Sequence, residues 1–177
     1  MADLLLVIDM QRGFVIEKTK HILPNVLRLV DRHVGPIMFT RFINKPDSGF
    51  VKWIHWSRFQ EEPETLLCPE LAEIAANNVL DKNGYTAFVP AFRAYLLDNE
   101  IDRIFICGVA TDSCVLKTAA DAFEEGIEPV VVKDACASHA GDEVHEAGLL
   151  LISRFVGRGQ IRTTEEVVTS WRPGEAG

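Results

Sequence analysis

The sequence predicts an α/β protein in which helices cover both faces of a parallel β-sheet. Short apolar runs rich in Val, Ile, Leu and Phe alternate with longer segments of helical period, which is the pattern of such a sheet. The 177 residues are 47% hydrophobic and 25% charged, as in an ordinary globular domain. Because a chain of this length buries about 70% of its unfolded surface, we expect one domain spanning residues 1–177.

Six apolar runs are the expected strands, and each ends in polar or glycine-containing sequence, as a strand does before a turn. In chain order they are Leu4–Ile8, Pro36–Phe42, Asn78–Leu80, Arg103–Gly108, Glu128–Val132 and the weak run Gln160–Arg162. Right-handed crossovers between parallel strands leave a crevice at the carboxyl ends, where the strand order reverses, and ligands bind there. A functional site is therefore expected among the residues that follow the strands.

Six segments between these runs have the spacing of helices. In chain order they are Pro24–His33, Leu71–Ala76, Ala91–Asn99, Ser113–Glu125, Gly141–Arg154 and Thr164–Ser170. The fourth is followed by Gly126, which suits a left-handed cap. The long segment Asn44–Pro69 has no regular pattern and contains two of the three tryptophans. A loop of this length is usually functional or locally ordered by its aromatic residues.

The composition excludes several classes of protein. Eighteen basic and 26 acidic residues give a net charge of −8, so neither nucleic acid nor an anionic membrane is an expected partner. The run Leu4–Ile8 is too short for a signal peptide or a membrane span. Cys68, Cys107, Cys114 and Cys136 form no CxxC pair and no disulfide framework. We therefore expect a cytoplasmic protein without a zinc–thiolate site.

The fourth expected strand is followed by small residues and then by Cys114 at the start of a helix. A thiol at this place lies near helix N–H groups, which lower a cysteine pKa and can hold an oxyanion, as a nucleophilic thiolate requires. The alternative is a buried and inert cysteine, which this spacing alone predicts equally well. Cys107, in the middle of a strand, is expected to be of the inert kind.

Asp9 and Lys82 follow the first and third expected strands. They can supply the base and the cation that a nucleophilic cysteine needs, although turn chemistry explains each residue better than catalysis does when it is taken alone. An aspartate after a strand also suits Mg²⁺-dependent phosphoryl transfer. Against this alternative, no carboxylate stands two residues after Asp9, and no P-loop or GxGxxG pattern follows any strand.

Four segments around these residues resemble the isochorismatase-like cysteine hydrolases, a family that includes nicotinamidases and N-carbamoylsarcosine amidohydrolases. The segments are Leu5–Gln11 with Phe14, Lys82–Phe88, Gly108–Thr111 with Cys114–Val115, and Lys133–Ser138. Each segment is a weak match alone, but the four in this order are specific and cover nearly the whole chain. The resemblance implies a three-layer, Rossmann-like fold with a six-stranded, mostly parallel sheet between helices.

The resemblance also implies a catalytic triad of Asp9, Lys82 and Cys114. Asp9 would take the thiol proton, Lys82 would stabilise the thiolate, and Cys114 would attack a carbonyl and form a thioester. A cis peptide between Val109 and Ala110 would direct the N–H groups of Ala110 and Cys114 at the substrate oxygen. The implied reaction is hydrolysis of the C–N bond of a small amide or carbamoyl compound, with no cofactor and no essential metal.

Departures from the family narrow the expected substrate. Nicotinamidases carry a metal-binding Asp-x-His after the second strand, where this chain reads Thr-Arg-Phe-Ile-Asn-Lys-Pro over residues 40–46. Since His55 alone makes a poor metal site, nicotinamide is disfavoured. Isochorismatases cleave a vinyl ether without a nucleophilic cysteine, so Cys114 favours C–N hydrolysis over that alternative. A catalytically silent binding protein of the same fold is the remaining alternative.

Residues near the strand ends are the expected walls of a substrate pocket. They are Gln11, Phe14, Trp53, Trp56 and Tyr85. Aromatic faces suit a small planar amide, although the two tryptophans are equally well explained by packing in a short helical turn.

Two further expectations concern charged residues and association. Arg41 can pair with a substrate carboxylate or, more commonly, with a neighbouring acid, whereas His139 and His145 are expected to be structural or to face solvent. We also expect a homo-oligomer, a dimer or a tetramer, because relatives associate and Asn44–Pro69 carries apolar residues that can meet a second subunit.

Overall fold

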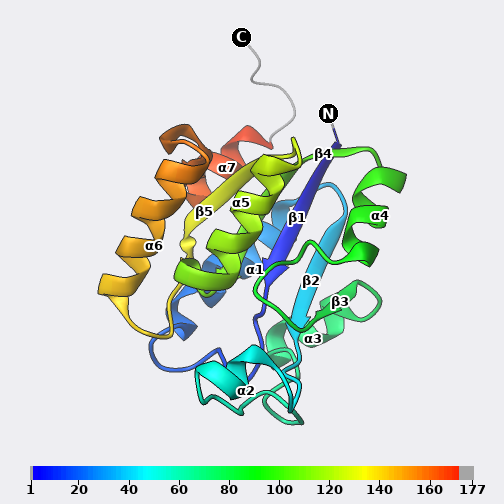
Figure 1. Ribbon diagram of the computed structural model, residues 1–177. Helices are drawn as coiled ribbons and strands as arrows, with labels where there is room; N and C mark the ends of the chain where they lie inside the picture. Colours follow the sequence, from blue (N-terminus) through cyan, green and yellow to red (C-terminus); the bar gives the residue numbers. More distant parts are fainter. Residues whose placement is uncertain (1, 172–177) are drawn as a thin grey trace.

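The computed structural model describes residues 2–171, and within them six parallel strands form one sheet in the order β3-β2-β1-β4-β5-β6 (Figure 1). The strands are β1 (Ala2–Ile8), β2 (Ile37–Phe42), β3 (Val79–Lys82), β4 (Ile101–Val109), β5 (Glu128–Ala137) and β6 (Ile161–Arg162). The chain order reverses between β1 and β4, which places a crevice at their carboxyl ends. The predicted α/β fold with a six-stranded parallel sheet is confirmed.

Helices cover both faces of this sheet. In Figure 1, α4, α5 and α6 lie on the near face, whereas α1 and α7 lie behind it. The α-helices are α1 (Leu23–Arg32), α2 (Gly49–Trp53), α3 (Pro69–Ala75), α4 (Pro90–Asp98), α5 (Leu116–Glu124), α6 (Asp142–Phe155) and α7 (Thr164–Ser170). Short turns of other pitch are η1 (Lys20–Ile22), η2 (Thr111–Val115) and η3 (Arg158–Gln160). In the part of the chain that the structure describes, every helix is too short or too polar to cross a membrane.

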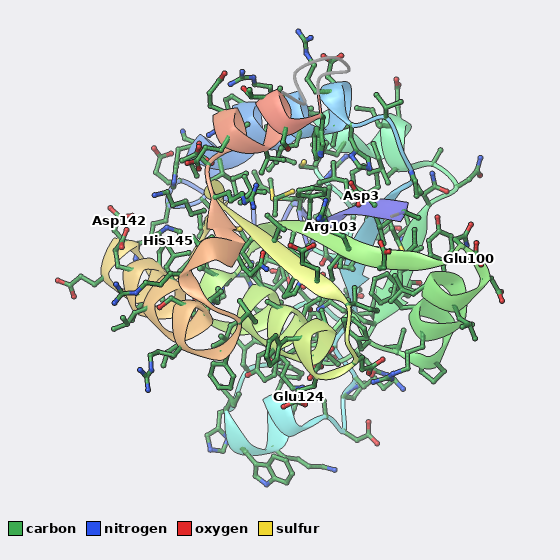
Figure 2. All side chains as sticks on the ribbon, turned by 90° about the horizontal axis from the view of Figure 1, so that it is seen from above. Asp3, Glu100, Arg103, Glu124, Asp142 and His145 are labelled. Atoms are coloured by element: carbon green, nitrogen blue, oxygen red, sulfur yellow. The ribbon has the colours of Figure 1, made fainter. Side chains whose placement is uncertain are left out.

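Charged side chains lie around the outside of the layers. Figure 2 shows Asp3 and Arg103 on the neighbouring strands β1 and β4, with the Arg103 Nη1 atom 3.8 Å from the Asp3 carboxylate. The same guanidinium also pairs with Glu128 on β5 at 2.7 Å. These contacts link three strands near the amino ends of the sheet, which leaves the opposite end of the sheet for the functional site.

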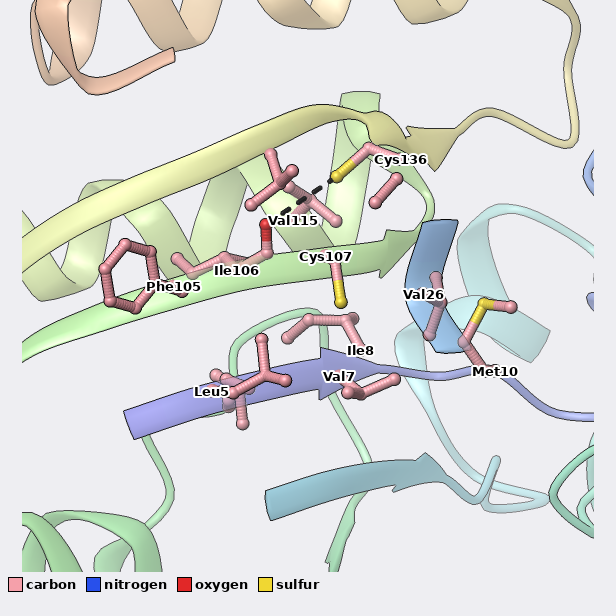
Figure 3. Close-up of a cluster of buried hydrophobic side chains, with 14 of the residues drawn as sticks. Leu5, Val7, Ile8, Met10, Val26, Phe105, Ile106, Cys107, Val115 and Cys136 are labelled. Carbon is pink, nitrogen blue, oxygen red and sulfur yellow. Dashed lines mark hydrogen bonds between the residues drawn. The ribbon is translucent and has the colours of Figure 1, made fainter. Parts of the chain in front are cut away.

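The core lies on both faces of β1 and β4. Figure 3 shows Cys107 and Cys136 among apolar side chains that include Ile8 and Val115. The Cys136 thiol lies 3.9 Å from the carbonyl oxygen of Ile106. Burial raises the pKa of Cys107 well above its usual range, as expected of an inert core cysteine.

Three elements differ from the sequence prediction. Helix α2 lies within the segment Asn44–Pro69, where the sequence predicts no regular element. The apolar run that predicts a strand ends at Val132, but β5 continues through the polar Lys133 and Asp134 to Ala137. It continues because residues 136 and 137 pair with Gly108 and Val109 of β4 after a shift in register. The helix predicted from Ser113 begins instead with η2, a π-turn, and becomes α-helical at Leu116.

Candidate active site

Strands β1 and β4 approach each other very closely where they end. Gly108 has a φ of +112°, and a Cβ atom at this position would lie 2.1 Å from the carbonyl oxygen of Ile8. A residue with a side chain does not fit here. The next residue after β1 is Asp9, whose φ of +49° turns the chain sharply away from the sheet. Aspartate is among the residues that adopt this region most readily.

The carboxyl ends of three strands bring Asp9, Lys82 and Cys114 together, as predicted. The Nζ atom of Lys82 lies 2.8 Å from Asp9 Oδ2 and 3.5 Å from the Sγ atom of Cys114. The side chains of Asp9 and Lys82 are 0% exposed. Two carbonyl oxygens also accept hydrogen bonds from Lys82, those of Gly84 at 2.9 Å and Tyr85 at 3.2 Å. The ammonium is therefore fixed between the carboxylate and the sulfur.

Thr40 on β2 fixes the other oxygen of the carboxylate. Its hydroxyl donates to Asp9 Oδ1 at 2.5 Å and accepts a hydrogen bond from the backbone N–H of Asp9 at 3.1 Å. With Oδ1 held in this way, Oδ2 faces Lys82. The sequence pattern predicts Thr40 only as a strand residue; its position beside Asp9 follows from the pairing of β2 with β1.

The surroundings of the Cys114 thiol raise its pKa to about 12. Burial is the largest cause, and the Asp9 carboxylate adds to it, whereas the Lys82 ammonium opposes both. The expectation of a lowered thiol pKa is therefore wrong for the resting site. Burial by itself lowers the pKa of Lys82, but Asp9 and Cys114 outweigh it and leave that pKa raised. The site thus holds a protonated thiol beside a carboxylate and an ammonium.

Helix α6 supports the turn that carries Cys114. A Cβ atom at Gly148 would lie 2.9 Å from the Asp112 backbone, so only glycine allows this approach. On the same helix, His145 Nδ1 lies 2.7 Å from the Thr111 hydroxyl, and Figure 2 shows His145 on α6. Burial lowers the pKa of His145, which favours the neutral ring. His145 is structural, as expected. A glycine in the interior of a predicted helix is the sequence signal that could have identified Gly148 as a point of close approach.

A cavity of about 240 Å³ opens above the triad. Its lining consists of Phe14, Phe42, Phe50, Ile54, Trp56, Tyr85, Ala110, Asp112, Ser113, Cys114 and His139. The aromatic rings also contact one another: Phe14 stacks on Trp56 at 6.3 Å, and Phe50 meets Tyr85 edge-on at 5.0 Å, between ring centroids. The Val109–Ala110 peptide is cis, as the resemblance implies. Cys114 thus lies at the floor of an aromatic cavity.

Three of the five predicted pocket residues, Phe14, Trp56 and Tyr85, line this cavity. Gln11 does not, because its buried amide donates to the carbonyls of Phe42 and Thr65, both at 2.9 Å, and accepts from the Phe42 N–H at 2.8 Å. Gln11 therefore fastens a loop to β2. Trp53 does not line the cavity either: it is 82% exposed on α2. The substrate contacts expected of these two residues are corrected accordingly.

Sequence reasoning missed six lining residues, namely Phe42, Phe50, Ile54, Asp112, Ser113 and His139. Phe42 is the last residue of β2 and shares a strand face with Thr40, two residues earlier, so its inward direction follows once β2 is known to border β1. His139 was expected to be structural or to face solvent; it is exposed and also stacks with Phe14 at 5.6 Å. Its place follows from the longer β5, which ends two residues before it.

Arg41 takes the more common of its two expected roles. Its guanidinium makes two hydrogen bonds to the Asp81 carboxylate, at 2.7 and 2.8 Å. Between residues 2 and 171, no three His, Cys, Asp or Glu side chains come together as the ligands of a metal ion would.

Comparison with known proteins agrees with this geometry. Residues 3–166 match the family described as "Isochorismatase domain". The isochorismatase family protein YwoC of Bacillus subtilis is 30% identical over 182 aligned residues, which cover 92% of this chain and 90% of YwoC. Nicotinamidase 3 of Arabidopsis thaliana is 31% identical over 156 aligned residues, which cover 82% of this chain and 78% of the nicotinamidase. The crystal structure of N-carbamoylsarcosine amidase from Thermoplasma acidophilum has the same fold, with a TM-score of 0.80 at 21% identity, over 93% of this chain and 98% of that one. The chain therefore belongs to the isochorismatase family.

Proposed function

We propose that this protein is a cysteine hydrolase that cleaves the C–N bond of a small amide or carbamoyl compound through a thioester. The observation that carries the proposal is the chain of contacts from Asp9 Oδ2 to Lys82 Nζ and on to Cys114 Sγ, 2.8 and 3.5 Å long, beneath the cavity. Two proteins with which this chain shares sequence or fold, a nicotinamidase and an N-carbamoylsarcosine amidase, are named for C–N hydrolysis.

The first half of the reaction forms the thioester. Asp9 takes the proton from the Cys114 thiol as Sγ attacks the carbonyl carbon, and the carbonyl oxygen becomes an oxyanion. Backbone N–H groups at Ala110 and Cys114, both in the cavity lining, would stabilise that charge. When the C–N bond breaks, the proton on Asp9 passes to the nitrogen, which leaves as ammonia or an amine. The acyl group remains on sulfur.

The second half releases the acid. Asp9, again a carboxylate, takes a proton from a water molecule as the water oxygen attacks the thioester carbon. The C–S bond breaks, and the sulfur recovers its proton from Asp9. Lys82 stays an ammonium throughout and stabilises the negative charge as it moves between Asp9 and the sulfur. The balance is one amide and one water consumed, and one carboxylic acid and one ammonia or amine formed.

The test is ammonia release from a panel of small primary amides and carbamoyl compounds, together with intact-protein mass spectrometry during turnover. We expect hydrolysis of at least one compound and an acyl adduct that maps to Cys114. Hydrolysis that persists in Cys114→Ala would contradict the thioester route. If no compound is hydrolysed and no adduct forms, a catalytically silent binding protein of this fold takes the place of the hydrolase.

A further inference from the structure

In the described part of the chain, the wall of the cavity above Cys114 contains one carboxyl group and one imidazole, that of His139, but no lysine or arginine. Among the described residues, the lining includes one Asp, Glu, Lys or Arg side chain, and it is Asp112. The Oδ1 atom of Asp112 is buried and accepts no hydrogen bond from any described residue. The rest of the lining is dominated by the rings of Phe14, Phe42, Phe50, Trp56 and Tyr85.

The two basic residues expected near the site are already engaged. Lys82 lies beneath Cys114, 0% exposed, and its ammonium contacts the Asp9 carboxylate, the sulfur and two carbonyl oxygens. Arg41 is held by Asp81 through two hydrogen bonds. Neither residue belongs to the cavity lining, so neither offers a counter-ion to a bound molecule.

The free energy of binding in this cavity depends on the charge of the ligand. A carboxylate that enters the cavity loses its water without gaining a lysine or arginine partner, and it also approaches Asp112. The faces of aromatic rings carry partial negative charge, so they add to this repulsion. The same faces attract a cation and stack against a flat, uncharged group. The cost of binding is therefore highest for an anion.

We infer that the cavity selects amides whose remaining group is uncharged or cationic, with aromatic carboxamides as the best fit, and that it refuses amides carrying a carboxylate. The refused class includes half-amides of dicarboxylic acids and N-carbamoyl amino acids. The inference rests on the proposed function, because it takes this cavity as the substrate site. It assigns a substrate class within C–N hydrolysis.

Matched thiol reagents test the charge preference without any need for hydrolysis. Iodoacetamide is neutral and iodoacetate is anionic, and the two are nearly equal in size. We expect the rate ratio of iodoacetamide to iodoacetate at Cys114, resolved by peptide mass spectrometry, to be at least ten times the ratio for glutathione. A ratio equal to or below that of glutathione overturns the inference, whether or not the protein hydrolyses amides.

A charge placed on the rim tests the cause. Ile54 lines the cavity and is 56% exposed, so it can carry a longer side chain. Ile54→Arg supplies a guanidinium, which the described lining residues lack, and Ile54→Gln is the neutral control. We expect the arginine to bring the reagent ratio back toward that of glutathione and the glutamine to leave it high. Equal ratios in the two variants would show that charge is not the cause and would overturn the inference.

The substrate test compares maleamide, which has two amide groups, with maleamate, in which a carboxylate replaces one of them. We expect kcat/KM for the diamide to exceed that for the half-amide at least 100-fold, and Ile54→Arg to narrow the gap. A half-amide that is hydrolysed as fast as the diamide overturns the inference. If neither is hydrolysed and the wider amide panel also fails, the proposed function fails, whereas the labelling ratio still decides the charge preference.

Discussion

The floor and the wall of the cavity come from parts of the chain that differ in how firmly they are held. The floor consists of residues at strand ends, where Asp9 and Lys82 are fully buried and joined by a 2.8 Å ion pair. Part of the wall, Phe50, Ile54 and Trp56, comes from residues 44–69, where Ile54 is 56% exposed and the rings pack on Phe14 and Phe42. Under the proposed function, the residues at the strand ends would carry out the reaction, whereas this segment would contribute to the choice of substrate.

The largest expected effect on kcat/KM is that of replacing Cys114, the cysteine at the floor of the cavity. Cys114→Ala removes the nucleophile, and we expect kcat/KM for the best amide to fall about 10⁴-fold or more. Cys68→Ala is the matched control, because Cys68 is buried but lies outside the cavity lining. Ammonia release measures both. A loss below about tenfold in Cys114→Ala would move the chemistry away from this residue.

The next effect concerns stability. Lys82→Met leaves the Asp9 carboxylate buried without its partner, and breaking a buried ion pair in this way costs about 3–5 kcal/mol of the free energy of unfolding. The double variant Asp9→Asn/Lys82→Met removes both charges and should recover much of that loss. Urea denaturation gives the three values, with Ile54→Ala in the wall expected within about 0.5 kcal/mol of the parent. A double variant no more stable than Lys82→Met would contradict an ion pair as the cause.

Alkaline pH should weaken the core through its thiols. Burial raises the pKa values of Cys107, Cys114 and Cys136. Above about pH 8.5 the unfolded chain loses these protons while the folded chain keeps them. The unfolded state then binds fewer protons, so the free energy of unfolding falls as pH rises, by about 1.4 kcal/mol per pH unit for each thiol.

Urea denaturation between pH 8 and 10 under reducing conditions measures this slope. Cys136→Ala should make it shallower by the share of one thiol, whereas wall variants should leave it unchanged. An equal slope in Cys136→Ala and the parent protein would show that this thiol ionises alike in both states.

The floor could be predicted from sequence because a simple geometric rule applies to it. The carboxyl ends of parallel strands meet at one edge of the sheet, and Asp9, Lys82 and Cys114 each follow or end an apolar run. The four motif segments around them, in their order along the chain, made the resemblance to the family specific. The raised pKa of Cys114 was not predictable, since it depends on the burial of the sulfur and on the distance to Asp9, neither of which spacing determines.

The wall could be predicted only in part, because a loop has no such rule. Trp53 and Trp56 are equivalent in the sequence, yet one faces solvent and the other the cavity. Their directions depend on the path of the loop, which Asn44 fixes by donating to the carbonyls of Trp56 and Arg58 at 3.1 and 2.9 Å. Contacts between residues 12 and 14 positions apart, on either side of the short helix α2, leave no periodic signal in the sequence.

A smaller effect is expected at Thr40, a positioning residue of the floor. Thr40→Val keeps the shape but removes the donor to Asp9 Oδ1, and the loss of a hydrogen bond to a charged group should lower kcat about 10- to 100-fold. Thr40→Ser keeps the hydroxyl and should restore kcat to within about threefold. Steady-state kinetics on the best amide measures both. Equal losses in the two variants would assign the effect to packing in place of the hydrogen bond.

The smallest effects should separate the two tryptophans of the wall. Trp56 lines the cavity and packs against Phe14, Phe42 and Phe59, so Trp56→Ala should raise KM about tenfold with kcat nearly unchanged, because the lost contact binds substrate and transition state alike. Trp53→Ala removes a ring that is 82% exposed, and both constants should stay within about twofold of the parent values. If Trp53→Ala also raises KM tenfold, the ring must fold over the bound substrate, and the wall then extends further along α2 than the cavity lining indicates.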